Sequence, residues 1–185
     1  LSLEVLKQYP HGLDLGPLQP CLPEYLFTND KLIHLLPEPI LDDFQQMKVQ
    51  FSSKASKSLM MISRRDLRTN NSWMHNSQRL IKGKDRCALL IHPEDAKEKG
   101  IVDRGKAFLK SRVGELKVDV VITEDVMRGV VCLPHGWGHD REGIALRVAQ
   151  TNPGVSMNDL TDDQRVDSMS GNAIFNGIPV EIAPC

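Results

Sequence analysis

Short apolar runs bounded by polar residues set the hydrophobic pattern of the chain after residue 50. Runs of this length are typical of buried strands, and they lie at 58–63, 86–91 and 130–133. Two pairs of β-prone segments are separated by short turns, 106–112 from 115–123 and 173–175 from 178–183. The second turn is an asparagine–glycine pair, which strongly favours a hairpin. The pattern predicts a mainly β domain with short helices and a barrel-like architecture.

The clearest helix signal lies at 93–99. Pro93 suits the first helical position, acidic residues fill the first turn, lysines fill the last, and Gly100 suits the position after the helix. A helix of about two turns is therefore expected between two of the strands.

The first 50 residues differ from the rest because prolines are dense there. Each proline fixes φ and removes a backbone donor, which disfavours regular helix or central strand. We expect residues 1–50 to be a proline-rich segment that connects a preceding domain to a domain at 51–185. Within it we expect a short strand near 31–35 and a helical turn at 41–47. The chain begins with Leu1 and shows no signal-peptide pattern, so it is expected to be a fragment of a longer protein.

Composition places the chain among ordinary globular proteins. Its 185 residues are 41% hydrophobic and 25% charged, with a net charge of −1. That charge argues against nucleic-acid binding, and no apolar run has the length of a membrane span. The four cysteines form no closely spaced pair, so neither a zinc site nor an iron–sulfur cluster is indicated. Cys87 and Cys132 lie in apolar runs and are predicted to be buried free thiols, which favours a cytoplasmic location.

Residues 63–76 follow a buried strand and combine three arginines with several amide side chains, a tryptophan and a histidine. Guanidinium groups suit phosphate oxygens, while amides suit the edge of a heterocycle and an indole lies against a fused ring. The alternative is a solvated loop whose polar side chains only cap turns.

Residues 133–139 place two glycines around Trp137, which exposes backbone amides to a ligand. The alternative is a tight structural loop. His135 and His139 have the spacing of metal ligands on a helix, but the proline and glycines around them disfavour a helix, so no metal site is expected. A third polar loop lies at 154–163, where the alternative is a helix cap. No catalytic motif is found, so the sequence indicates binding and no catalytic residue.

Taken in order, several segments resemble the C-terminal domain of the bis-pterin molybdenum and tungsten oxidoreductases, the superfamily of dimethyl sulfoxide reductases and formate dehydrogenases. The matching segments are 64–76, 91–96, 100–101, 111–114, 129–131, 134–138, 158–161 and 170–173. The stretch at 10–18 also resembles the segment that precedes this domain in the same enzymes. It favours a formate-dehydrogenase-like branch of the superfamily. One departure is 103–108, where an Asp-Arg-Gly turn replaces the family's usual Asp-Gly-Asp turn.

The resemblance implies a double-psi β-barrel, also described as an aspartate-decarboxylase-like barrel, that closes over molybdopterin guanine dinucleotide carrying molybdenum or tungsten. It implies that metal ligands and redox chemistry belong to preceding domains of the parent enzyme. The residues implied to face the cofactor are Arg64, Arg65, Arg68, Asn70, Asn71, Ser72, Trp73, His75, Asn76, His135, Gly136, Trp137, Gly138, Asn158, Asp159 and Asn172.

Two other interpretations stay open on sequence alone. A double-psi barrel can also serve as a protein-interaction module, because a fold does not determine function. An RNA-binding domain would use the basic residues between Arg64 and Arg86, but the net charge and an aromatic content of 5% argue against it.

Overall fold

The computed structural model of the chain describes residues 1–52 and 58–185. It divides into two compact units, Leu1–Phe44 and Gln45–Cys185. The first unit contains α1 (Leu3–Lys7), whose first turn is capped by the Ser2 hydroxyl oxygen accepting from the Val5 amide at 3.4 Å. The predicted boundary at residue 50, between a connecting segment and the cofactor-binding domain, stays a prediction.

Two expectations for the N-terminal segment are revised by the structure. The predicted helical turn at 41–47 is part of a longer helix, α2 (Glu38–Ser52), which begins with Pro39 in its first turn. The predicted strand at 31–35 is wrong, because these residues form no strand. Lys31 has a φ of 56°, and the Thr28 hydroxyl donates to the Leu32 carbonyl at 2.8 Å. This local side-chain hydrogen bond stabilises a turn at these residues instead of an extended strand.

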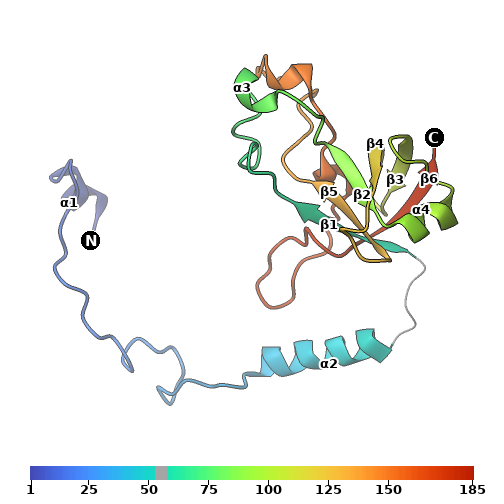
Figure 1. Ribbon diagram of the computed structural model, residues 1–185. Coiled ribbons are helices and arrows are strands. Elements are labelled where there is room, and N and C mark those ends of the chain that lie inside the picture. The colour runs from blue at the N-terminus through green and yellow to red at the C-terminus, as the bar shows by residue number, and fades with distance from the viewer. Residues whose placement is uncertain (53–57) are drawn as a thin grey trace. The chain divides into compact units, whose positions relative to one another are not determined.

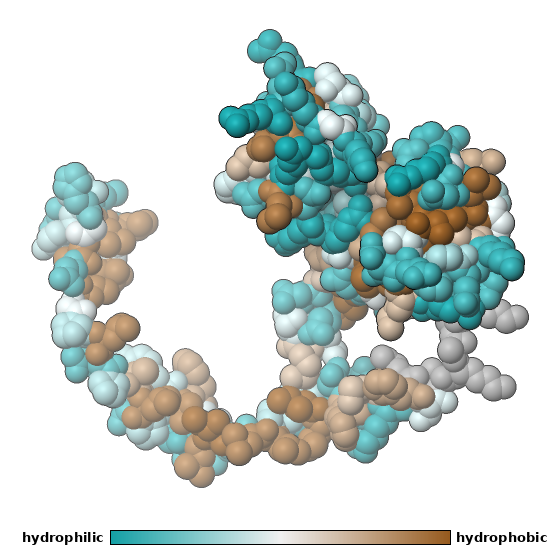
Figure 2. All heavy atoms as spheres, in the orientation of Figure 1, coloured by the Kyte–Doolittle hydropathy of each residue, from teal (hydrophilic) through white to brown (hydrophobic). Residues whose placement is uncertain are grey.

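The first unit buries few of its apolar side chains. Leu18 and Phe27, for example, are fully exposed, and Figure 2 shows hydrophobic residues along much of this segment. No helix among residues 1–52 and 58–185 has both the length and the apolar content needed to cross a membrane.

The second unit is built on a closed barrel with the strand order β1-β5-β2-β4-β3-β6 (Figure 1). Its strands are β1 (Leu59–Arg64), β2 (Ala88–Ile91), β3 (Lys106–Lys110), β4 (Glu115–Ile122), β5 (Val130–Pro134) and β6 (Ile178–Pro184). β1 pairs parallel with β5 and β2 pairs parallel with β4, while the other four pairings are antiparallel. This mixed, closed six-stranded arrangement is a double-psi β-barrel, as expected.

Short helices complete this unit. α4 (Pro93–Lys99) is confirmed with Pro93 at its start and Gly100 in the left-handed conformation at its end. The others are α3 (Gln78–Ile81) and the 3₁₀ helices η1 (Ala149–Thr151) and η2 (Met157–Leu160).

One predicted hairpin is confirmed and the other is wrong. β3 and β4 pair as antiparallel neighbours, as the turn between them predicts. The asparagine–glycine pair joins no hairpin, because β6 pairs with β1 and β3 and the chain before it forms only an isolated bridge. The Asn176 side-chain oxygen instead accepts from the Ser63 amide at 2.7 Å, and the Gly177 amide donates to the Met61 carbonyl at 3.0 Å. Long-range pairing with β1 therefore overrides the local turn preference.

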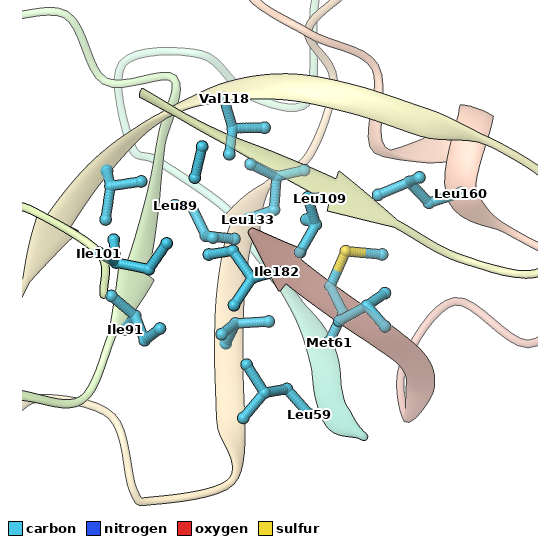
Figure 3. Packing of buried hydrophobic residues seen from close by; sticks show 14 of the residues in the cluster. Leu59, Met61, Leu89, Ile91, Ile101, Leu109, Val118, Leu133, Leu160 and Ile182 are labelled. Atoms are coloured by element: carbon cyan, nitrogen blue, oxygen red, sulfur yellow. The ribbon is translucent and has the colours of Figure 1, made fainter. Parts of the chain in front are cut away.

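Alternating side chains of all six strands fill the barrel. β3 and β6 alternate buried and exposed positions, whereas β5 is buried along almost its whole length. Figure 3 shows Leu89, Leu133 and Ile182 pointing towards one another from different strands. Cys87 and Cys132 are buried free thiols, as predicted. This packed interior fixes the strand ends from which the polar loops leave.

Candidate functional site

The two loops with the strongest binding signal leave the barrel at the same end. β1 and β5 are parallel neighbours, with Arg64 paired to Pro134 at their carboxyl ends. The His135 amide donates to the Arg64 carbonyl at 2.9 Å, which extends this contact into the loops. In Figure 1 the loop after β1 and the chain after β5 both run away from the barrel towards α3. Residues about 60 positions apart in sequence thus form one site.

A glycine lets the two loops touch backbone to backbone. A Cβ at Gly136, whose φ is 90°, would stand 2.4 Å from the Asn71 carbonyl oxygen and 3.1 Å from the Ser72 nitrogen. Asn70 and Asn71 themselves have positive φ values of 42° and 62°, which asparagine tolerates better than most residues. The local backbone therefore requires the residue types that the sequence shows at these positions.

A second close approach brings in the third polar loop. A Cβ at Gly138 would lie 2.6 Å from Ser156 Cβ. The Gly138 amide donates to the Pro153 carbonyl at 2.7 Å, and the His139 amide donates to the same oxygen at 3.2 Å. The loop that leads into η2 thus packs directly on the chain after β5.

Three rings form the buried centre of the site. His75 and Trp137 lie with ring centroids 4.2 Å apart, and His139 meets His75 edge-on at 4.7 Å. His75 Nδ1 and His139 Nε2 share a hydrogen bond of 2.5 Å. His75, Trp137 and His139 are at most 7% exposed. The rings connect the loop after β1 to the loop after β5.

Burial keeps both histidines neutral. It lowers the pKa of His75 to about 4, with a further contribution from the nearby His139, while Asp66 acts in the opposite direction. Burial also lowers the pKa of His139, against the opposing effects of Asp140 and the Gly136 carbonyl. Two like charges at hydrogen-bond distance would repel strongly in this buried position.

The histidine pair predicts a loss of stability in acid. In the unfolded chain a histidine takes up its proton near pH 6.5, so above that pH both states are neutral and the full stability is present. As the pH falls from about 6.5 towards 4, the unfolded chain binds protons that the folded His75 does not. The free energy of unfolding then falls by up to about 1.4 kcal/mol per pH unit for each such proton.

Urea unfolding at several values between pH 7 and 4.5 measures this slope. In the variant His75→Asn the slope is expected to be smaller than in the unchanged chain. Equal slopes in the two proteins would contradict the assignment of this acid sensitivity to His75.

The three predicted arginines have different surroundings. Arg64 is half-buried, and its Nη2 donates to the carbonyls of Arg86 and Ala88, both at 3.2 Å. Arg68 donates from Nη1 to the Lys82 carbonyl at 3.2 Å. Arg65 is exposed and lines a pocket of about 470 Å³. The pocket is also lined by Asp66, Leu67, Asn70, Asn71, Met74 and Leu80. Arg65 therefore stands where it can meet a ligand.

Three other predicted residues lie at the rim of the site or already have a partner within the chain. The Asn76 side-chain oxygen accepts from the amides of Val148 and Ala149 at 2.9 and 3.3 Å, so it ties the first loop to η1. Trp73 is 80% exposed at the rim. Asp159 forms an ion pair with Arg141.

Asn158 and Asn172 complete the predicted set. Asn158 is exposed on η2, beside the third loop. Asn172 is exposed in the loop before β6, where its amide donates to the Ser170 hydroxyl at 3.3 Å. The structure brings most predicted residues into one region, but no contact links Asn172 to it. The same loop does reach His135 through Phe175, whose ring centroid is 6.3 Å away.

Four buried side-chain atoms in the described chain have no hydrogen-bond partner, and all belong to predicted cofactor residues. They are Arg64 Nη1, Asn71 Oδ1, His75 Nε2 and Trp137 Nε1. A buried polar atom without a partner costs about 1–3 kcal/mol, so native proteins rarely keep several together. This set offers two donors and two potential acceptors, which matches the mixed edge of a polar heterocycle.

Sequence reasoning missed the role of His139 and of Pro153, although it singled out the loop at 154–163 that follows Pro153. The sequence suggests His139 only as a metal ligand, whereas the structure pairs its ring with His75. The signal available in the sequence was the second glycine of the 133–139 loop, which indicates a close approach but does not identify the partner. Among residues 1–52 and 58–185, no group of three or more potential ligand side chains is placed to hold a metal ion.

Comparison with protein families identifies the barrel. Residues 59–179 match the family model described as the Molydopterin dinucleotide binding domain. The matched range contains β1 to β5 and every predicted cofactor residue.

Two curated proteins show significant similarity over shorter stretches. The F420-dependent formate dehydrogenase 1 subunit alpha of Methanococcus maripaludis is 37% identical over 60 residues, which are 32% of this chain and 9% of that protein. The trimethylamine-N-oxide reductase of Haemophilus influenzae is 36% identical over 56 residues, 30% of this chain and 7% of that protein. The similarity thus spans less than a tenth of either relative.

Among solved structures, acetylene hydratase from Pelobacter acetylenicus has the same fold over most of the chain. The superposition has a TM-score of 0.56 at 18% sequence identity and covers 84% of this chain and 21% of that one.

Proposed function

Because the chain belongs to the molydopterin dinucleotide binding domain family, we propose that it is the cofactor-binding part of a larger molybdenum or tungsten oxidoreductase, in which the redox reaction takes place in other domains. The small share of each relative that it matches supports this interpretation. The cofactor, when bound, supplies the metal centre for the redox reaction, and this chain supplies the groups that hold it.

The observation that carries the proposal is the position of the four unpartnered buried atoms. One lies at the end of β1 and three lie on the two loops that the β1–β5 pairing brings together, and all belong to residues that the family resemblance assigns to the cofactor. The proposed pterin contacts are Asn71, His75 and Trp137. Hydrogen bonds to a pterin would remove the cost of leaving their polar atoms without partners.

The dinucleotide end is assigned to the more exposed side of the site. Arg65 lines the 470 Å³ pocket beside Asn70, and a guanidinium group suits a diphosphate through paired hydrogen bonds. Asp159 is proposed to accept from the guanine edge while it keeps its ion pair with Arg141. Comparison of guanosine diphosphate with adenosine diphosphate tests the assignment of the guanine base.

A calorimetric titration of the full chain with guanosine diphosphate tests the phosphate assignment. Arg65→Ala is expected to weaken binding about 10-fold, since a hydrogen bond to a charged group contributes roughly 1.5–3 kcal/mol and exposure to water reduces it. Lys97→Ala removes the same charge from the exposed side of α4 and is expected to leave the affinity unchanged. Equal losses in both variants would show only general charge attraction, and no loss in Arg65→Ala would contradict the assignment.

The proposed partners are the cofactor and the preceding domains of the parent enzyme. The exposed apolar residues of the first unit are consistent with a segment that contacts another domain. The cytoplasmic location inferred from the free thiols stays a proposal.

A further inference from the structure

The paired imidazoles of His75 and His139 have a defined proton arrangement. Both rings are neutral at neutral pH, so each carries one ring proton. The 2.5 Å contact between His75 Nδ1 and His139 Nε2 needs a proton on one of these two atoms and none on the other. The hydrogen bond made by the far side of either ring decides which atom carries it.

The far side of the His139 ring decides the arrangement. The Gly136 carbonyl, from the same loop, acts to raise the pKa of this ring and so favours a proton on the side of the ring that faces it. Because Nε2 of His139 already faces His75, the proton directed to the carbonyl sits on Nδ1. His139 Nε2 is then an acceptor, and His75 Nδ1 must donate to it.

The same arrangement leaves His75 Nε2 without a proton. This atom is one of the four buried atoms that have no partner within the described chain. A bare imidazole nitrogen accepts a hydrogen bond and offers none. This buried atom can therefore accept from a ligand that carries an N–H or O–H donor.

We propose that His139 is a positioning residue, which holds His75 in the tautomer whose Nε2 accepts a hydrogen bond from an N–H donor of the pterin. The inference rests on the proposed function for the identity of the ligand, but the tautomer itself is a property of this chain alone. It gives the His-Gly-Trp-Gly-His loop a role beyond close packing, because the last histidine of the loop sets the hydrogen-bonding character of a residue in the loop after β1.

The competing interpretation is that His139 only packs against His75. Two substitutions separate these roles. His139→Gln supplies a side-chain oxygen that can accept from His75 Nδ1, whereas His139→Leu introduces an apolar side chain and removes the acceptor. A packing role predicts similar behaviour in both variants, while a positioning role predicts rescue by glutamine only.

The test is nuclear magnetic resonance of the ring nitrogens in the full chain with ¹⁵N-labelled histidine, first without any ligand. In the unchanged chain and in His139→Gln, the His75 proton is expected on Nδ1. In His139→Leu, part of the population is expected to move it to Nε2. A proton on His75 Nε2 in the unchanged chain would overturn the proposal, even if the leucine variant fails to fold, and so would an unaltered tautomer in a folded leucine variant.

Addition of a free reduced pterin then tests the ligand. The His75 Nε2 resonance is expected to shift, and the affinity for the pterin is expected to fall about 10-fold in His139→Leu and to stay within about threefold in His139→Gln, as for one lost hydrogen bond. An unshifted Nε2 resonance in pterin-bound protein would overturn the pterin contact. Failure to bind both the pterin and guanosine diphosphate would count against the proposed function, while the ligand-free spectra would still decide the tautomer.

Discussion

Replacing Gly136 with alanine is expected to destabilise the second unit by about 3 kcal/mol or more, which corresponds to a fall of roughly 10 °C in Tm. Two costs add. A φ of 90° is unfavourable for a residue with a Cβ, and the new atom would stand 2.4 Å from the Asn71 carbonyl oxygen and 2.6 Å from its carbon. Both atoms belong to backbone, so relief requires the two loops to separate.

Gly143→Ala is the matched control for this substitution. Gly143 has a φ of 84°, but a Cβ there would meet nothing within 4 Å. Gly143→Ala is expected to lower the free energy of unfolding only by the cost of placing a Cβ at a positive φ, about 1–2 kcal/mol. Thermal unfolding of the two variants therefore isolates the steric part. If Gly136→Ala were no less stable than Gly143→Ala, the loops would not be in the backbone contact described here.

Separation of the loops is also expected to weaken ligand binding. Gly136 contacts Asn71, whose side-chain oxygen is one of the unpartnered atoms. Gly136→Ala should therefore lower the affinity for the free pterin even at a temperature where the variant is fully folded, and Gly143→Ala should not.

Replacing Leu133 with alanine is expected to cost about 2–5 kcal/mol, because it removes a fully buried side chain and leaves a cavity. Leu133 lies on β5, which pairs with both β1 and β2, and it points into the barrel beside Leu89 (Figure 3). Urea unfolding measures the change. The exposed Leu67 is the matched control, since Leu67→Ala is expected to change stability by less than about 0.5 kcal/mol. A cost below about 1 kcal/mol for Leu133→Ala would contradict the packing of this core.

Local signals predicted those elements whose neighbours in space are also neighbours in sequence. The helix α4 has its proline, its charges and Gly100 within one short stretch, and the β3–β4 hairpin closes over a few residues. Both were therefore readable from the pattern. The hairpin predicted at Asn176 does not form, because β6 pairs with strands more than 60 residues away in the chain. No local sequence signal indicates a strand pairing over such a distance.

The candidate site could also be predicted only in part, because it depends on a long-range strand pairing. The residue types of 64–76 and 134–138 indicated a ligand, and the family resemblance indicated which ligand. The parallel pairing of β1 with β5 brings these loops together, and short-range periodicity cannot reveal it. For the same reason the sequence did not reveal the contact of His139 with His75, which spans 64 positions. It also did not separate Arg65, which is free to meet a ligand, from Arg64, which donates to the carbonyls of Arg86 and Ala88.

The three loops together are proposed to form one face for the pterin dinucleotide. The most direct test records amide resonances of the full chain during titration with guanosine diphosphate, with adenosine diphosphate as the control. We expect shifts confined to residues 65–76, 136–139 and 156–160, and larger shifts with the guanine nucleotide than with the adenine nucleotide. Shifts outside these loops, or none, would contradict a nucleotide site there, and equal shifts with both nucleotides would contradict guanine recognition.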